Sequence, residues 1–301
     1  MTNDHSQPPT MLVCLAHPDD ETFGMGGTLA LYALRGVQVH LVCATRGEVG
    51  DVDPELMQGF NSIAERRESE LRCAVGILGL IGVYFLGYRD SGMPGTSDNQ
   101  NPNALAAQPV DEVARKIVHY IRLLKPQVMV THDPIGGYKH PDHIAMHRAT
   151  VRALELASDL NFPDDLPPFK PEKLYYQTMP KNLLRWAVKL APLLRMDPHH
   201  FGRNHDIDLA TLVDEGDFPT HARINCQSVS QIRDEATACH TSQLGGSIGR
   251  KGPMALLRRY LGSTETFMRA LPAPESGLRE RDLFDGIEWT RDPHPIEKSD
   301  R

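Results

Sequence analysis

Two clusters of polar residues have the composition that metal binding and water activation need. The first, His-Pro-Asp-Asp-Glu at 17–21, directly follows a strand-like apolar run at 11–16. The second, His-Pro-Asp-His at 140–143, comes shortly after a second strand-like run at 127–131. Hydrolytic metal sites use about three imidazole or carboxylate ligands and leave one position open for water. The two clusters therefore supply donors for one divalent metal and for a general base.

A turn leaving the first strand can aim His17 and Asp20 at one point, because the two residues are three positions apart. His143 would complete a set of two histidines and one carboxylate, which suits Zn²⁺ and also Fe²⁺. The metal lowers the pKa of its water to about 7, and Asp19 is positioned to accept the proton as general base. The alternative is purely structural, since Asp is a common helix cap and Asp142 could serve as one.

An alternation of strands and helices predicts how the two clusters meet. The predicted strands are 11–16, 37–44, 83–86 and 127–131, and the predicted helices are 28–34, 54–75, 110–125 and 143–157. This order predicts an α/β fold with a Rossmann-like, mostly parallel sheet flanked by helices. The carboxyl ends of parallel strands share one edge, where such folds build their sites.

The second half is less regular, and we expect it to complete the site. Its predicted elements are strands 174–177 and 222–225, helices 181–194, 228–239 and 254–261, and a surface excursion at 196–218. We expect a disordered lead at 1–9, a Rossmann-like metal-binding part at 10–160 and a tail at 291–301. The C-terminal part, 161–290, would pack on the metal-binding part as one continuous domain.

Composition argues against several classes of protein. The net charge is −7, no block of Lys and Arg occurs and aromatic residues make up 6%, so a nucleic-acid partner is not expected. No apolar stretch reaches the ~18 to 20 residues of a membrane span. Dispersed cysteines without a C-x-x-C pair are typical of free thiols in a reducing cytosol, so we expect a cytoplasmic protein. The sequence leaves open whether the protein forms a homo-oligomer. The cysteines are Cys14, Cys43, Cys73, Cys226 and Cys239.

The remaining histidines fit structural roles better than ligand roles. His132 directly follows the fourth predicted strand and is either a residue behind the site or a polar strand end. His240, on a late helix, is expected to pack under the site. The histidines at 199, 200 and 205 fall in the irregular excursion and are interpreted as surface residues.

A dinucleotide-binding interpretation of Gly24-x-Gly26 fails on two positions. The third glycine of that fingerprint is absent, since position 29 is Leu. The acidic residue expected at the end of the second strand is also absent, because Ala-Thr-Arg stands at 44–46. We predict no nicotinamide cofactor.

The two clusters together resemble the LmbE-like de-N-acetylases of the PIG-L superfamily. Their hallmarks are Ala-His-Pro-Asp-Asp-Glu after the first strand, here at 16–21, and a later His-Pro-Asp-His, here at 140–143. The likeness spans about 11–243, and it includes the loop 87–93, Arg67 with Glu70-Leu71, and His-Thr-Ser-Gln at 240–243. Within the family, the Arg-Asp-Ser-Gly-Met loop and Tyr138 are most similar to the deacetylases and amidases of mycothiol metabolism.

The resemblance implies a role for each polar group of the clusters. His17, Asp20 and His143 would bind the metal, and Asp19 would be the general base. His140 would stabilise the tetrahedral oxyanion or protonate the leaving amine. Asp142 would orient His140 from behind, and Tyr138 would swing over the scissile amide.

The implied reaction is hydrolysis of an N-acetyl group on a glucosamine-type sugar, with zinc as the expected metal and Fe²⁺ as the alternative. Arg67 and Asp90 would bind sugar hydroxyls. Glu48, after the second strand, is a further candidate for a substrate contact.

Two other functions remain open at this stage. An amidase could remove a larger acyl group from a glucosamine-thiol conjugate, but Thr22 and Phe23 leave no Lys beside Glu21 to grip a thiol-linked group, which favours acetyl removal. A non-catalytic sugar-binding module of the same fold would need no base, so Asp19 argues against it.

Overall fold

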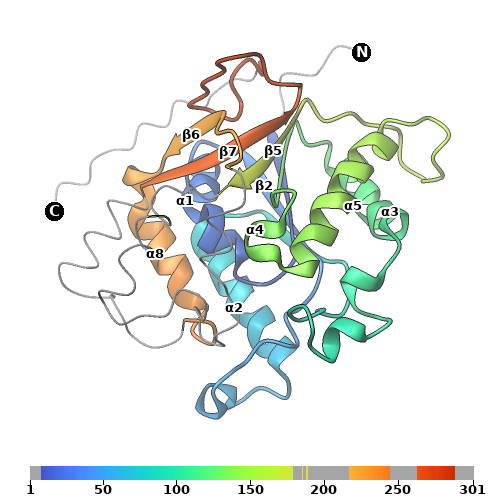
Figure 1. The fold of residues 1–301 in the computed structure, drawn as a ribbon. Helices are drawn as coiled ribbons and strands as arrows, with labels where there is room; N and C mark the ends of the chain where they lie inside the picture. Colours follow the sequence, from blue (N-terminus) through green and yellow to red (C-terminus); the bar gives the residue numbers. More distant parts are fainter. Residues whose placement is uncertain (1–7, 179–184, 186–187, 189–216, 245–262, 289–301) are drawn as a thin grey trace.

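One seven-stranded sheet forms the centre of the molecule (Figure 1). The chain is presented as a computed structural model, which describes residues 8–178, 185, 188, 217–244 and 263–288. The strands are β1 Thr10–Leu15, β2 Gln38–Cys43, β3 Gly82–Phe85, β4 Val128–Thr131, β5 Lys173–Thr178, β6 Ala222–Asn225 and β7 Thr264–Leu271. Their order across the sheet is β3-β2-β1-β4-β5-β7-β6.

The sheet is parallel from β3 to β5 and antiparallel beyond it. From β1 the chain continues to β2 on one side, whereas β4 lies on the other side. Open α/β sheets bind ligands at such a reversal of strand order, outside the carboxyl ends of the strands. The predicted α/β class is confirmed, and both polar clusters follow the two strands at this reversal.

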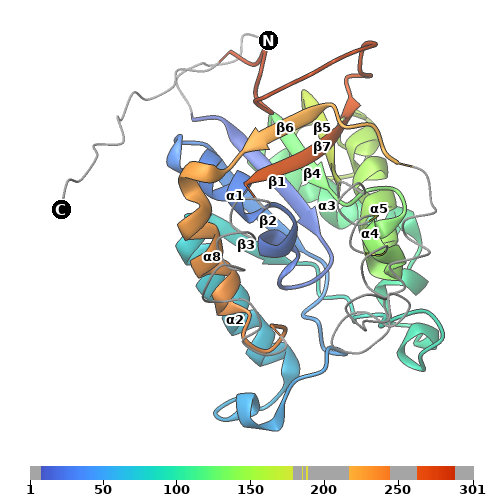
Figure 2. The ribbon, with the colours of Figure 1, turned by 60° about the vertical axis from the view of Figure 1, so that its left-hand side comes forward.

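Helices cover both faces of the sheet (Figures 1 and 2). One face carries α1 Asp20–Leu34, α2 Ile63–Leu78 and α8 Ser230–Cys239, and the other carries α3 Val110–Leu124, α4 Gly136–Lys139 and α5 Pro141–Ala157. Alternate residues of β1 point to opposite faces, so Val13 joins the core under α1 and α2 while Leu12 joins the core under α3 and α5. Burial on both faces explains why β1 is a continuous apolar run.

Helix α1 begins at Asp20, eight residues before the predicted start at 28. The helix is kinked at Met25, where φ is −150° and ψ is 20°. Past the kink, the Glu265 carboxylate accepts the backbone N–H groups of Gly27 and Thr28 at 2.9 and 2.7 Å. A carboxylate at newly exposed helical N–H groups acts as a cap. This cap comes from β7, 237 residues away from Thr28 in sequence, so the local pattern does not reveal the first eight residues of the helix.

The predicted helix over 54–75 is wrong at its start. Residues Pro54–Met57 form a separate 3-10 turn, and α2 begins at Ile63. The Ser62 hydroxyl accepts the Glu65 N–H at 3.1 Å, which gives α2 a side-chain N-cap. The left-handed Gly79 ends the helix at Leu78.

The other predicted elements among the described residues lie within about two positions of those observed, and β7 is a strand that the sequence did not predict. Helix α5 starts at Pro141 rather than at His143, because Pro suits the first position of a helix. No helix among the described residues is both long and apolar enough for a membrane span. Several predictions lie wholly or mostly outside the described residues, namely those for 1–7, 181–194 apart from the helical residues 185 and 188, most of 196–218, 254–261, 291–301 and the histidines at 199, 200 and 205.

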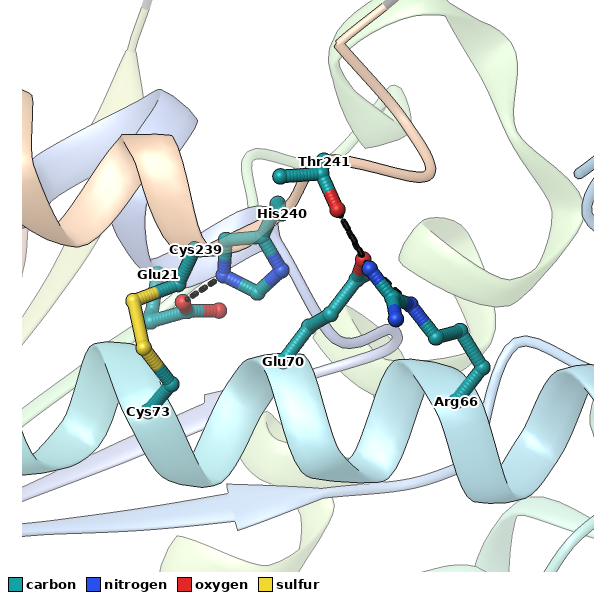
Figure 3. The surroundings of a disulfide bond; sticks show 7 residues. All are labelled: Glu21, Arg66, Glu70, Cys73, Cys239, His240 and Thr241. Carbon is teal, nitrogen blue, oxygen red and sulfur yellow. Dashed lines mark hydrogen bonds and ion pairs between the residues drawn. A yellow bond between two sulfur atoms is a disulfide. The ribbon is translucent and has the colours of Figure 1, made fainter. Parts of the chain in front are cut away.

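The expectation that all five cysteines are free is wrong. Cys73 of α2 and Cys239 of α8 form a disulfide, with their Cα atoms 5.9 Å apart and the two residues 166 positions apart in sequence (Figure 3). The pairing depends on the packing of α8 along α2, which no local spacing reveals. Cys14, Cys43 and Cys226 are free and buried, as predicted. The cytoplasmic expectation rested partly on free thiols and stays a prediction.

Candidate metal centre and active site

The two polar clusters meet at the ends of β1 and β4. The His17 Nδ1 atom lies 3.3 Å from His143 Nε2, although the residues are 126 positions apart. Asp20 completes the group, with Oδ1 at 3.2 Å from His143 Nε2 and Oδ2 at 3.7 Å from His17 Nδ1. The structure therefore brings together the three residues that the sequence nominated as metal ligands.

The distances between these three residues are near those of a divalent metal site, although the two distances to Asp20 involve different oxygen atoms. Groups in which one atom from each residue could hold an ion include His17, His140 and His143, and Asp20, His132 and His143. Zinc bonds to nitrogen and oxygen of about 2.0 to 2.2 Å place the ligand atoms of a tetrahedral site roughly 3.3 Å apart. The His17 Nε2–H donates to the Asp142 carboxylate at 3.0 Å, which leaves the Nδ1 lone pair directed at the site. Asp20 accepts the backbone N–H groups of His17 and Ala16 at 2.8 and 3.2 Å, as an ionised carboxylate does.

Electrostatics keep the Asp20 carboxyl ionised. Burial alone would raise the pKa of Asp20, but the imidazoles of His143 and His132 hold that pKa well below its usual range. His132 stacks on His143 with ring centroids 3.9 Å apart, and its Nε2 accepts the Ala16 N–H at 3.1 Å. That bond occupies the lone pair of His132 Nε2, although Asp20, His132 and His143 also form a group that could hold a metal ion.

The Asp142 carboxylate contacts His17 and not His140. It is fixed by the backbone N–H of Ser91 at 2.9 Å and by a short hydrogen bond from the Ser91 hydroxyl. The predicted orientation of His140 comes instead from the Asp142 backbone N–H, which donates to His140 Nδ1 at 3.2 Å. Ser91 is a residue of the site that was not predicted, and its only signal in the sequence was its place in the 87–93 loop.

His140 lies beside the ligands as the N-cap of α5. Its ring centroid is 4.4 Å from that of His17 and 5.0 Å from that of His143, so it could also join a metal-binding group. Burial, together with the neighbouring imidazoles of His17 and His143, holds the pKa of His140 well below its usual value. With Nδ1 occupied, the neutral imidazole carries its proton on Nε2.

Tyr138 covers the two imidazoles of the second cluster. Its ring stands edge-on to His140 and His143, with centroids 5.7 and 5.3 Å apart. The tyrosine lies in α4 between Gly137 and Lys139, which have φ values of 67° and 68°. Its predicted movement over a substrate amide stays a prediction.

Asp19 occupies a strained turn at the entrance to α1. Its φ is 121°, a value that costs a non-glycine residue about 1–3 kcal/mol and persists only where the surroundings hold it. Burial raises the pKa of Asp19 to about 6, even though Arg67 opposes the rise. A carboxyl with a pKa near neutrality beside a metal site suits a general base.

Arg67 holds this turn in place. Its Nη2 donates to the Asp19 carboxylate at 3.0 Å and to the Pro18 carbonyl at 2.7 Å, and its Nη1 donates to the Gly47 carbonyl at 3.1 Å. A side chain on Gly47, whose φ is 66°, would overlap the guanidinium. Arg67 is 5% exposed and is committed to protein acceptors, so a contact with sugar hydroxyls stays a prediction.

Asp90 and Glu48 form an acidic edge of the site. Asp90 Oδ1 lies 3.6 Å from His17 Nε2 and accepts the Gly92 N–H at 2.8 Å. The Glu48 carboxylate accepts the Asp90 N–H at 3.2 Å. Burial would raise the pKa of Asp90, but His17 holds it below its usual range. Asp90 lies beside His17, and Glu48 is joined to it through the Asp90 backbone N–H. A contact of either carboxylate with a substrate stays a prediction.

Known proteins resemble this chain along most of its length. A family model described as PIG-L, GlcNAc-PI de-N-acetylase, matches residues 12–154. The 1D-myo-inositol 2-acetamido-2-deoxy-alpha-D-glucopyranoside deacetylase of Streptomyces scabiei is 35% identical over 92% of this chain and 89% of that protein. The protein of the same name from Geodermatophilus obscurus is 36% identical over 92% of this chain and 97% of its own length.

Solved structures share the fold. The conserved protein TT1542 of Thermus thermophilus superposes with a TM-score of 0.58 and 25% identity, covering 88% of this chain and 96% of its own. An N,N'-diacetylchitobiose deacetylase of Pyrococcus horikoshii superposes with a TM-score of 0.60 and 20% identity, covering 89% of this chain and 86% of its own. The second likeness is evidence for the fold alone.

Proposed function

This chain belongs to the PIG-L family of GlcNAc-PI de-N-acetylases, and we propose that it hydrolyses the N-acetyl group of a glucosamine-containing substrate in a metal-dependent reaction. The observation that carries the proposal is the convergence of His17, Asp20 and His143 within 3.2 to 3.7 Å, with Asp19 next to them. A sugar-binding module would need neither the strained Asp19 turn nor its buried guanidinium clamp.

The three donors would hold one divalent ion, with zinc as the proposed metal. When bound, such an ion polarises the acetamide carbonyl and lowers the pKa of water. Asp19 accepts a proton from the attacking water, which its pKa of about 6 allows near neutral pH. The Asp19 carboxyl is 15% exposed, so water can reach it.

His140 serves the other side of the reacting carbonyl. Its neutral imidazole carries the proton on Nε2 and donates a hydrogen bond to the oxygen that gains negative charge. When the C–N bond breaks, the proton removed from water ends on the departing amine nitrogen. Acetate and a free amino sugar are the products.

The substrate that we favour is 1D-myo-inositol 2-acetamido-2-deoxy-alpha-D-glucopyranoside, the compound named for the relatives at 35 and 36% identity. Its hydroxyl groups suit the carboxylates of Asp90 and Glu48, which accept hydrogen bonds from sugars. A small polar amino sugar is thus the proposed partner.

Amine release from a panel of substrates tests this function. The panel holds the inositol-linked N-acetylglucosaminide, free N-acetylglucosamine and a glucosamine-thiol conjugate with a larger acyl group. Each is offered to metal-stripped, zinc-loaded and anaerobic iron-loaded protein. We expect metal-dependent release of acetate, fastest from the inositol glycoside. Faster cleavage of the conjugate would favour an amidase, and no release with stoichiometric metal bound would favour the sugar-binding module.

A further inference from the structure

A buried ion pair that the proposed reaction does not use lies directly behind Asp19. The His240 Nε2 atom is 2.6 Å from Glu21 Oε1, and both residues are 0% exposed (Figure 3). A carboxylate without a partner is costly to bury, and an imidazole removes that cost only while the two groups stay in contact. Each residue therefore fixes the position of the other.

The second oxygen of Glu21 holds the strained turn. Glu21 Oε2 accepts the backbone N–H of Asp19 at 2.9 Å. Arg67 grips the carboxylate of the same residue at 3.0 Å. The unusual φ of Asp19 is therefore held from two sides, by a guanidinium at its side chain and by the Glu21–His240 pair at its amide.

Helix α2 anchors His240 through the segment 239–242. The Glu70 carboxylate accepts the N–H and the hydroxyl of Ser242 at 2.9 and 2.6 Å and the Thr241 hydroxyl at 2.9 Å. The Cys73–Cys239 disulfide ties the residue next to His240 to the same helix. Figure 3 shows the disulfide and the contact between Glu70 and Thr241 on either side of the histidine.

One face of α2 thus carries both supports of Asp19. Arg67, Glu70 and Cys73 follow each other at three-residue spacing, which puts them on neighbouring turns of one side of a helix. The first acts on the Asp19 carboxylate directly, and the other two act through the segment that carries His240.

We propose that His240 is a positioning residue, which acts through Glu21 to hold the Asp19 amide and thereby to aim the Asp19 carboxylate at the reacting water. The disulfide and the Glu70 contacts hold His240 in the position where it contacts Glu21. The inference rests on the proposed role of Asp19 as general base.

Replacing His240 separates positioning from simple packing. Gln can offer an N–H near the place of Nε2, whereas Leu fills similar space without one. We expect His240→Leu to lower kcat about 10- to 100-fold with KM and bound zinc unchanged, since a small misplacement of a catalytic group has effects of this order. His240→Gln should recover most of the loss, and the exposed His119→Leu is the matched control.

A double-mutant cycle tests the path through Glu21. If His240 acts through Glu21, adding His240→Leu to Glu21→Gln should lower kcat by much less than it does alone. Cys73→Ser should lower kcat only about two- to threefold, because the Glu70 contacts remain. This third variant also keeps the inference testable if His240→Leu does not fold.

The outcomes separate this inference from the proposed function. Wild-type protein and Asp19→Asn are assayed beside the variants. An active wild type, an inactive Asp19→Asn and a His240→Leu enzyme with normal kcat would overturn the inference alone. Equal losses in the Leu and Gln variants, or losses that multiply in the cycle, would also overturn it. A wild type that releases no acetate with any metal would instead remove the proposed function.

Discussion

The two polar clusters reach the same site by different physical means. The cluster at 140–143 is largely organised by local contacts, since His140 caps α5, Pro141 starts the helix and the Asp142 N–H donates to His140. The cluster at 17–21 depends on distant contacts, from Arg67 48 residues away and from His240 paired with Glu21 219 residues away. A helix N-terminus supplies its own geometry, whereas a strained turn needs the rest of the fold to hold it.

The largest effect on kcat should follow removal of the proposed general base, Asp19, from the cluster at 17–21. Asp19→Asn should lower kcat by about 10²- to 10⁴-fold, because general-base catalysis contributes that much. Zinc should stay bound, since the three donors are untouched. Turnover assays with metal analysis measure both quantities. Loss of metal together with activity would mean that Asp19 is itself a ligand.

A change in the locally organised cluster should act on the metal instead. Asp142→Asn should weaken zinc binding about 10- to 100-fold, because the carboxylate that orients His17 at 3.0 Å is lost. The backbone N–H that fixes His140 remains, so α5 should keep its N-cap. Chelator competition measures the zinc affinity, with the exposed Asp111→Asn as control. Unchanged zinc affinity would contradict the ligand role of His17 Nδ1.

The fall of kcat/KM at low pH should depend on the cluster at 17–21 and not on the cluster at 140–143. Asp19, with a pKa of about 6, must be deprotonated to act, so kcat/KM should fall about tenfold per unit as pH drops below that value. His140, whose pKa is lowered by burial, is neutral throughout and should add no limb there. Arg67→Gln should move the limb to higher pH, because the guanidinium opposes protonation of Asp19, and the exposed Arg72→Gln should not. If the acid limb of kcat/KM lies at the same pH in Arg67→Gln as in the wild type, Asp19 is not the group that causes it.

The smallest effect on activity should come from cutting the covalent link between α2 and α8, although stability should drop. The link joins residues 166 positions apart, and such a cross-link stabilises by about 2–4 kcal/mol through its constraint on the unfolded chain. Cys73→Ser should lower the free energy of unfolding by that amount in denaturant titrations. Thiol titration of the unfolded wild type should find three free cysteines. Five thiols without reductant would contradict the bond.

Much of the fold was predictable because its signals are short-range. Apolar runs bounded by turns marked β1 to β6, and the apolar face of α3 marked that helix. The start of α2 was missed although its Ser62 cap is local, but the other main errors fall where a distant residue decides a local structure. Glu265 caps the kink of α1, and Cys239 pairs with Cys73. Strand β7 joins the sheet between β5 and β6, a place that only the tertiary pairing assigns.

The sequence alone determined which groups the site contains: two histidines and two adjacent carboxylates, at the ends of two strands that had to share an edge. Tertiary structure decided how those groups are aimed. It turned the Asp142 carboxylate to His17, committed Arg67 to Asp19 and set His240 behind Glu21. Residue types limit which bonds can form, but the direction of a buried side chain depends on partners from other elements, which the chain brings together only when it folds.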